Sequence, residues 1–280
     1  MPDVEYSEYS NRQLLVVPLA LLAVAIVVLA GWWVMTGSPV DMGIAFTGGS
    51  ELRVANTTQP AIQDTFGGEL SSIQPVRASQ DTFVLQFQSG NAQALAEQAR
   101  GAGMEVVQSS ATGASFARDS QTLAIIGVAV AFVAMSLLVF GLFRTFIPSI
   151  AVILSALSDI LVPLAVMNLV GIQLSLGTVA ALLMLIGYSV DSDILLNNHV
   201  LRRSGGFYES VYNARETGVT MTVTSIAAMA VMAVLATFFQ ISIMADIGVV
   251  LVIGLTADLV NTYLLNVTLL RWYKFEGVAR

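Results

Sequence analysis

The sequence lacks cysteine altogether, and lysine and histidine each occur once among its 280 residues. Without cysteine the chain forms neither a disulfide nor a thiolate metal site, which excludes redox chemistry on thiols. The single histidine, His199, cannot build a metal site alone. A phosphate-binding loop of the form GxxxxGK[ST] is also absent from the sequence. We therefore expect no metal, no cofactor and no enzymatic activity.

Charged residues are scarce as well, at 11% of the chain, and acidic residues outnumber basic ones. The formal net charge is −7, and all but one of the 12 basic residues are arginine. An acidic chain with so little lysine suggests a cell that works at high salt, such as a halophilic archaeon. We expect no nucleic-acid partner.

Apolar residues make up 56% of the sequence, far more than a soluble chain of this length can bury. They gather in runs of about 20 residues, the length that an α-helix needs to cross a hydrocarbon core of about 30 Å. Six runs are found, at residues 14–35, 121–143, 147–169, 175–198, 219–239 and 243–270. The leader before the first run carries Asp3, Glu5 and Glu8 against Arg12 alone, so this run should remain as an anchor and not be cleaved. We predict a polytopic α-helical protein of the cell membrane with six transmembrane helices.

The basic residues predict how the chain is oriented, because positive charge concentrates on the cytoplasmic side of a membrane. Most of them flank the apolar runs on one side if both termini share that side: Arg12, Arg144, Arg202, Arg203, Arg215, Arg271, Lys274 and Arg280. We expect residues 1–13 and 271–280 to be cytoplasmic, 14–35 and 119–270 to hold the transmembrane helices, and the long loop 36–118 to lie outside.

The long loop reads as a small folded domain. Strand-like segments lie at SELRVAN, SIQPVRAS, DTFVLQFQ and MEVVQSS, and helix-like segments at QPAIQDTF and NAQALAEQAR. Their order, βαββαβ, predicts a ferredoxin-like α+β domain with an antiparallel sheet covered by two helices. The charged residues here alternate along surfaces that we expect to face solvent, so we place no active site in it.

Carboxylates inside the apolar runs are the best candidates for function, because each costs about 2.5–3.5 kcal/mol near the middle of a bilayer. The candidates are Asp159, Asp191, Asp193 and Asp258. A carboxylic acid held in a dry interior keeps its proton to higher pH and can release it when water or a cation approaches, which is the basis of a proton relay. The alternative for each is a hydrogen-bonded contact between helices, and for Asp193 an interfacial position.

None of the six apolar runs contains lysine or arginine, so these carboxylates have no basic partner within the runs. Either they are protonated or another subunit pairs with them. A row of hydroxyl residues in the fifth run, Thr220, Thr222, Thr224 and Ser225, either lines a polar path or bonds back to helical carbonyl groups.

Several segments resemble motifs of one family. FTGGS, with Phe46, Thr47, Gly48 and Gly49, looks like its DFTGG motif, and GYSVDSDILLNNHVLRR at 187–203, beginning Gly187, Tyr188 and Ser189, resembles its fourth-span motif. NARETGVTMTVTS at 213–225 and GVVLVIGLTADLVNTY at 248–263 fit its later spans. Together they resemble the SecF members of the SecD/SecF family, in the resistance-nodulation-division superfamily. Ala45 departs from the acid that usually precedes FTGG.

The resemblance implies a subunit that works with SecD and the Sec translocation channel, and that uses an ion gradient, of protons or of sodium, to assist movement of exported polypeptides. It makes Asp191 the first candidate for the ion-coupling carboxylate, with Asp193 as substitute and Asp159 and Asp258 in support. Asp191 stands where bacterial members often have asparagine and matches the acid of SecD, but the small outer domain argues against SecD itself. The alternatives are one half of a small-molecule or lipid exporter and a scaffold of the translocation channel that transports nothing.

Overall fold

The structure is a computed structural model that describes residues 6, 8–76, 81–88, 91–202, 206–239 and 241–275. Four parts of the predictions lie outside the described residues. They are the outer parts of both termini, residues 77–79 of the second predicted strand and Arg203 at the end of the fourth-span motif.

The chain divides into two compact units. The helical unit comprises Met1–Val40, Gly127–Ile172 and Gly177–Arg280, and the sheet unit comprises Asp41–Ile126 and Gln173–Leu176. Each is described by itself below.

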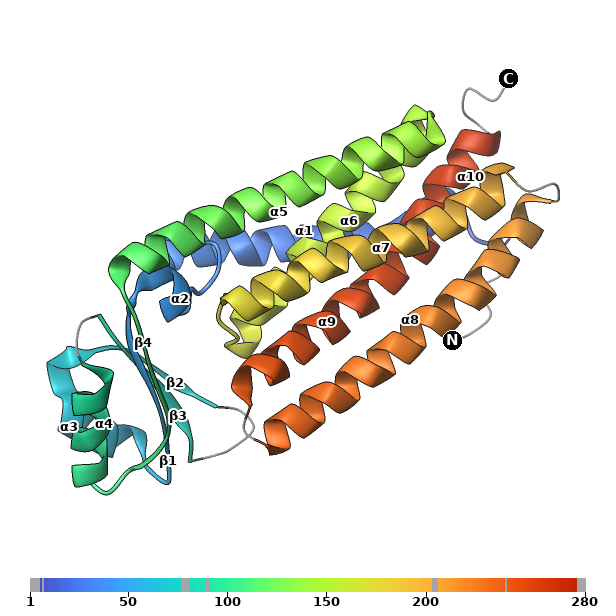
Figure 1. The fold of residues 1–280 in the computed structure, drawn as a ribbon. Coiled ribbons are helices and arrows are strands. Elements are labelled where there is room, and N and C mark those ends of the chain that lie inside the picture. Colours follow the sequence, from blue (N-terminus) through green and yellow to red (C-terminus); the bar gives the residue numbers. More distant parts are fainter. Residues whose placement is uncertain are drawn as a thin grey trace. The chain divides into compact units, whose positions relative to one another are not determined.

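Among the described residues, six helices are long and apolar enough to cross a membrane, as the sequence predicted. Along the chain they are α1 (Asn11–Thr36), α5 (Ala114–Phe143), α6 (Phe146–Val170), α7 (Leu176–Arg202), α8 (Phe207–Phe238) and a last helix that runs from α9 (Ser242–Val260) through η2 (Asn261–Asn266) into α10 (Val267–Phe275) (Figure 1). A polytopic helical membrane protein is thereby confirmed. The π-helical segment η2 inside the last helix was not predicted.

The helices extend beyond the apolar runs, because polar residues at membrane surfaces continue a helix as readily as apolar ones. Ser10 starts α1 through a capping box with Gln13, whose side chain accepts from the Ser10 backbone. Helix α8 begins at Phe207, well before the run predicted at 219, so that Arg215 lies on the helix itself.

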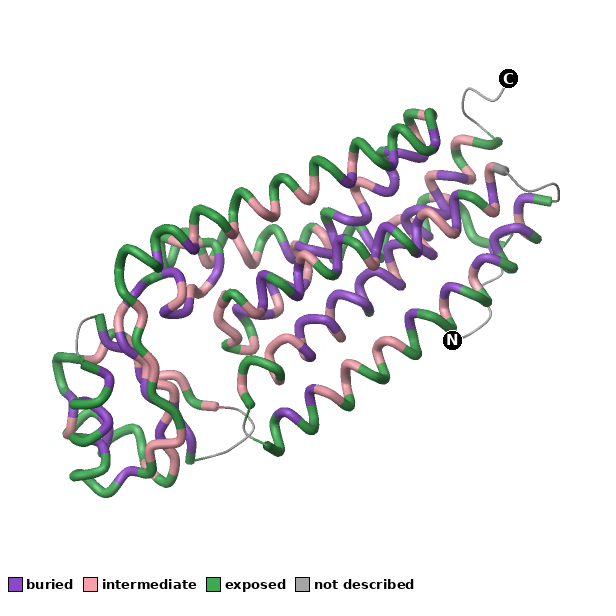
Figure 2. The backbone as a smooth tube through the Cα atoms, in the orientation of Figure 1, coloured by how far each residue is buried: buried purple, intermediate pink, exposed green. Residues whose placement is uncertain are grey.

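Burial separates inner from outer helices in Figure 2. In α6 and in α7, 56% of the most apolar stretch is buried, against 22% in α1, 17% in α8 and 11% in α5. Small residues allow neighbouring helices of the unit to approach closely. A Cβ atom on Gly254 of α9 would collide with Leu185 of α7, and one on Gly248 would lie 2.8 Å from the Cβ of Ala233 on α8.

The sheet unit has the predicted βαββαβ order. Its elements are β1 (Gly49–Ala55), α3 (Gln59–Phe66), η1 (Gly67–Glu69), β2 (Leu70–Pro75), β3 (Phe83–Phe87), α4 (Ala92–Gly101) and β4 (Glu105–Thr112). All strand pairs are antiparallel in the order β2-β3-β1-β4. Alternate residues of β1 and β3, such as Leu52, Val54 and Leu85, are fully buried in one core with Ile62 of α3 and Ala99 of α4. This confirms the predicted ferredoxin-like domain.

The FTGGS segment turns the chain into β1. Phe46 is buried in the short helix α2 (Ile44–Thr47), and Gly48 and Gly49 follow with φ of 73° and 106°. Residues other than glycine rarely adopt such angles. A Cβ atom on Gly49 would also collide with the carbonyl oxygen of Phe87 on β3. The two glycines are therefore required by backbone geometry.

Candidate functional site

Three carboxyl groups from three different helices meet in the interior of the helical unit. Asp159 lies on α6, Asp193 on α7 and Asp258 on α9, and their side chains are 1%, 0% and 1% exposed. Thr262 is hydrogen-bonded to both Asp193 and Asp258, Ser192 to Asp258, and Ser189 to Asp159. We call these aspartates and the residues hydrogen-bonded to them the carboxylate cluster.

Asp159 accepts hydrogen bonds at both oxygens. Ser189 of α7 donates to Oδ2 over 2.6 Å, and Asn261 of η2 donates to Oδ1 over 2.6 Å. Ser155, one turn earlier on α6, donates to Oδ2 over a longer 3.5 Å. Asp159 therefore joins α6 to both α7 and the last helix.

Asp258 and Asp193 share the hydroxyl of Thr262. Ser192 donates to Asp258 at 3.0 Å and 3.1 Å from its two oxygens. Thr262 lies 2.8 Å from Oδ1 of Asp193 and 3.3 Å from Oδ1 of Asp258. Asn266 donates to the same oxygen of Asp193 over 2.9 Å. Serine, threonine and asparagine supply all the hydrogen bonds described for these carboxylates.

The π-helical segment η2 supplies half of the described donor residues. Asn261, Thr262 and Asn266 follow Asp258 by three, four and eight residues, which places their side chains on the same face of a helix as Asp258. A π-helical turn inside an α-helix is rare and often occurs at functional sites. Here it carries Asn261, Thr262 and Asn266, all at most 1% exposed.

Some buried polar atoms of the cluster have no hydrogen-bond partner among the described residues: Oδ2 of Asp193, Oδ1 of Asn197 and Oδ1 of Asn261. An unpaired carboxylate oxygen in a dry interior is costly. A proton, a water molecule or a cation at Asp193 would remove that cost. No group of three His, Asp or Glu side chains suited to a metal ion is found in the described ranges.

Asp191 does not join the cluster. It is exposed on α7, whereas Asp193 is fully buried. Two residues along an α-helix are separated by about 200° around its axis, so the two aspartates face opposite sides. The four predicted aspartates thus divide into an inner three and an outer one.

The fourth-span motif contributes to the interior at two of its first three positions. Ser189 donates to Asp159, and the hydroxyl of Tyr188 lies 2.6 Å from that of Ser225 on α8. Gly187 is exposed. Of the hydroxyl row on α8, Thr220, Thr222 and Thr224 donate to backbone carbonyl groups of their own helix, which favours the second interpretation of that row.

Sequence reasoning did not single out the donors Ser155, Ser192, Asn261, Thr262 and Asn266. The polar spacing along the last apolar run, from Asp258 to Asn266, was a usable signal. Ser155 and Ser192 carried no comparable signal, because single serines are common in membrane helices.

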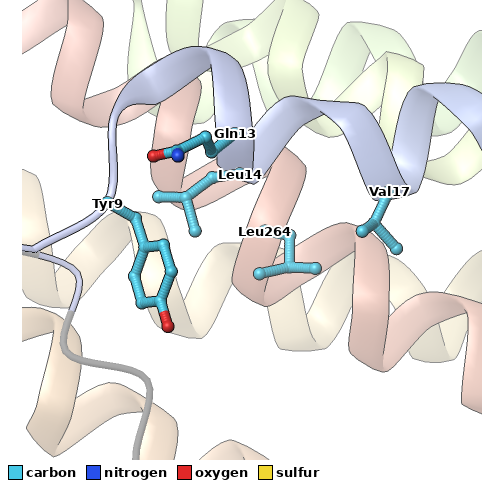
Figure 3. Close-up of a pocket in the computed structure, with 5 residues that line it drawn as sticks. All are labelled: Tyr9, Gln13, Leu14, Val17 and Leu264. Atoms are coloured by element: carbon cyan, nitrogen blue, oxygen red, sulfur yellow. The ribbon is translucent and has the colours of Figure 1, made fainter.

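A separate pocket of about 270 Å³ opens at the other side of η2. It is lined by Tyr9, Gln13, Leu14, Val17 and Leu264, with no member of the carboxylate cluster (Figure 3). The cluster is therefore not reached through this pocket.

Comparison with known proteins agrees with the motifs. Residues 92–276 match the family described as "Protein export membrane protein SecD/SecF, C-terminal". The protein-export membrane protein SecF of Haloferax volcanii is 62% identical over all of this chain and 98% of its own length. SecF of Haloquadratum walsbyi is 60% identical over the same shares, and SecF of Pyrococcus furiosus is 34% identical over 96% of this chain and 94% of its own. The first two relatives support the expected halophilic archaeal origin.

Solved structures share the fold. SecDF from Thermus thermophilus, described as a translocon-associated membrane protein, superimposes with a TM-score of 0.76 at 20% identity. The match covers 94% of this chain and 38% of SecDF. A structure of SecDF in a super-membrane-facing form gives a TM-score of 0.59 at 20% identity, over 93% of this chain and 38% of that one. Because SecF proteins that are 34–62% identical to this chain match at least 96% of its length, the chain belongs to the SecF group of the SecD/SecF family of protein-export membrane proteins.

Proposed function

We propose that the chain works with SecD at the Sec translocation channel and couples ion movement through the carboxylate cluster to late movement of exported polypeptides. The proposal starts from what is common to the family, a transport subunit of the export machinery. It adds an energy source and the residues that use it.

The carboxylate cluster is the observation that carries the proposal. Three carboxyl groups in one dry interior, supported only by hydroxyl and amide donors, repel one another when all are ionised. Such a group holds fewer negative charges than it has carboxyls and takes up or releases cations as water reaches it. A cluster that served only to join helices would use asparagine or serine at lower cost.

Within the cluster, Asp193 is the carboxyl that we assign to ion exchange. Both oxygens of Asp159 and both of Asp258 accept hydrogen bonds, whereas Oδ2 of Asp193 has no partner among the described residues. We take the exchanged ion to be either a proton or a sodium ion.

Asp191 supports the assignment of a partner. An exposed carboxylate on a membrane helix is costly unless another chain covers it with a donor or a basic group. The Thermus protein combines SecD and SecF in its name, and this chain matches 38% of it. We therefore take a separate SecD chain to correspond to the part of the Thermus protein that this chain does not match. We assign Asp191 to the contact with SecD.

The orientation completes the proposal. Both termini lie in the cytoplasm, where the flanking arginines concentrate, and the sheet unit lies outside, where emerging polypeptides arrive. Fusion of a reporter enzyme to either terminus and to the loop at Gly113 would test this directly.

Two matched substitutions test the function. Asp193→Asn keeps the shape of the side chain and removes its charge, so we expect normal protein level, retained SecD and loss of export. Asp191→Asn makes the same change on the opposite face of α7, and we expect less SecD to co-purify. Normal export by Asp193→Asn at normal protein level would reject the coupling role and favour a scaffold.

A further inference from the structure

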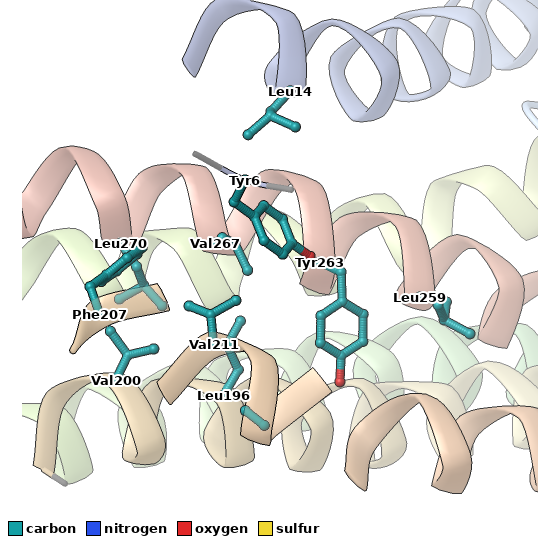
Figure 4. Packing of buried hydrophobic residues seen from close by; sticks show 11 residues of the cluster. Tyr6, Leu14, Leu196, Val200, Phe207, Val211, Leu259, Tyr263, Val267 and Leu270 are labelled. Carbon is teal, nitrogen blue, oxygen red and sulfur yellow. The ribbon is translucent and has the colours of Figure 1, made fainter. Parts of the chain in front are cut away.

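Of the residues before α1 that the structure describes, 6 and 8–10, only Tyr6 is buried in the helical unit. Tyr6 is 1% exposed, although Glu8, Tyr9 and Ser10 next to it are exposed. Figure 4 shows its ring inserted among residues of four helices. Together they form a hydrophobic cluster, distinct from the carboxylate cluster, that consists of Tyr6, Leu14, Leu196, Val200, Phe207, Val211, Ala214, Leu259, Tyr263, Val267 and Leu270.

Arg271 of α10 fixes the backbone of this segment. One of its guanidinium nitrogens donates to the carbonyl oxygens of Tyr6 and Tyr9, each over 2.8 Å. The ring of Tyr6 lies 5.8 Å from that of Tyr212 on α8. The segment is thus attached to both α8 and α10.

This packing lies directly beside the carboxylate cluster. Leu196 follows Asp193 by three residues on α7, and Tyr263 is adjacent to Thr262, which donates to Asp193. In Figure 4 the hydroxyl of Tyr6 points toward Tyr263. Tyr6 therefore lies between the carboxylates and the terminal end of the unit, where α1 begins and α10 ends.

At this end of the unit a side chain from outside the helices fills the space between them. The ring of Tyr6 occupies space bordered by α7, α8 and α10, and burial raises the pKa of Tyr6 to about 12, as expected for a phenol without water around it. The pocket in Figure 3 borders the same segment through Tyr9, and α1 through Leu14. On that side the segment adjoins open space instead of packed side chains.

We propose that Tyr6 is a removable closure that keeps water from the carboxylate cluster at the terminal end of the helical unit. When the segment withdraws, the gap between α7, α8 and α10 opens and water reaches Asp193. The purpose of this opening rests on the proposed ion coupling, but the closure itself does not. Tyr6 is thus a positioning residue that controls access to the site.

The absence of cysteine from the sequence allows a direct test with a single introduced thiol. Leu196→Cys places the thiol behind Tyr6, in a position that is 0% exposed. Met167→Cys places one at an equally buried position near the opposite end of α6, as a control for general loosening. Val211→Cys on α8 is a second reporter if the first variant folds poorly.

Each reporter is combined with Tyr6→Ala, Tyr6→Phe or Tyr9→Ala, and reacted with a water-soluble maleimide in membrane vesicles without an ion gradient. Labelling follows the fraction of molecules that are open, so we expect Tyr6→Ala to speed labelling of Leu196→Cys by about tenfold or more. Tyr6→Phe fills the same space, and Tyr9 is 45% exposed, so neither should change the rate.

Unchanged labelling of Leu196→Cys and Val211→Cys in the Tyr6→Ala background would overturn the closure. So would an equal increase at Met167→Cys, which would mean that the whole unit loosens. Because the vesicles carry no gradient, these outcomes do not depend on ion coupling. Normal export by Asp193→Asn would reject the coupling while leaving the labelling result to decide on Tyr6.

Discussion

Thr262 donates its hydroxyl hydrogen to Oδ1 of Asp193 over 2.8 Å and thereby joins the π-helical segment η2 to α7. Asn266 donates to the same oxygen over 2.9 Å. Two donors on one oxygen and none on the other orient the carboxyl group, so its unpaired Oδ2 is held in one place. Orientation of this kind lets a single carboxyl exchange an ion at a defined position.

Replacing Thr262 by valine should therefore disturb the cluster. Valine has nearly the same shape but no hydroxyl, so Oδ1 of Asp193 loses its shorter hydrogen bond in a dry interior. We expect the free energy of unfolding to fall by about 1–3 kcal/mol. Thermal unfolding in detergent at high salt measures this. Thr262→Ser keeps the donor and should lose less, and equal losses for the two variants would contradict the role of the hydroxyl.

The fourth-span motif gives a second, internal comparison. Ser189 donates to Asp159 over 2.6 Å, whereas a Cβ atom on Gly187 would meet nothing within 4 Å. Ser189→Ala should lower the free energy of unfolding by about 1–3 kcal/mol, because it leaves a buried carboxylate oxygen with only the long contact to Ser155. Gly187→Ala should not destabilise the isolated chain. If both variants unfold like the unmodified protein, Ser189 does not support the cluster.

The sequence predicted more of the fold than of the site. The six apolar runs and the alternation of strand-like and helix-like segments in the long loop are long, repeated signals. The six membrane helices and the βαββαβ domain follow from them. The π-helical segment depends on how the last helix packs against α6 and α7, which no local pattern of NTYLLN specifies. The resemblance makes Asp191 the first candidate. In the structure, however, Asp191 is exposed, whereas Asp193, two residues further along α7, is fully buried.

The sheet unit carries a group whose ionisation opposes folding. Burial raises the pKa of Glu51 above its ordinary value of 4.5, although a hydrogen bond from Gln86 and the charge of Arg53 act the other way. A folded-state pKa above the unfolded-state value means that the contribution to stability is fully present below pH 4.5 and is lost as the pH rises through the folded pKa.

Glu51→Gln should therefore protect the sheet at neutral pH. We expect backbone amides of β1 and β3 to exchange more slowly in the variant than in the unmodified chain at about pH 7, and equally at or below about pH 4.5. Comparing the two proteins at the same pH cancels the intrinsic dependence of amide hydrogen exchange on pH. A difference that is the same at every pH would show that the carboxylate charge is not the cause.

Gly218 of α8 and Tyr263 of η2 lie so close that a substitution at one should be compensated by a substitution at the other. A Cβ atom on Gly218 of α8 would collide with the hydroxyl of Tyr263, which is buried and has no hydrogen-bond partner among the described residues. The Tyr263 ring is 5% exposed and cannot move aside without disturbing the packing around Tyr6. Gly218→Ala should thus lower the free energy of unfolding by about 1–3 kcal/mol through overpacking.

Removing the hydroxyl relieves the collision at little cost, because no hydrogen bond is lost with it. Tyr263→Phe alone should be nearly neutral, and Gly218→Ala with Tyr263→Phe should recover most of the stability that Gly218→Ala loses. Gly141→Ala on α5, where a Cβ atom meets nothing within 4 Å, is the control for the intrinsic effect of alanine in a helix. Thermal unfolding of the four variants measures the coupling between the two residues. Additive losses in the double variant would mean that α8 and η2 are not in contact at this point.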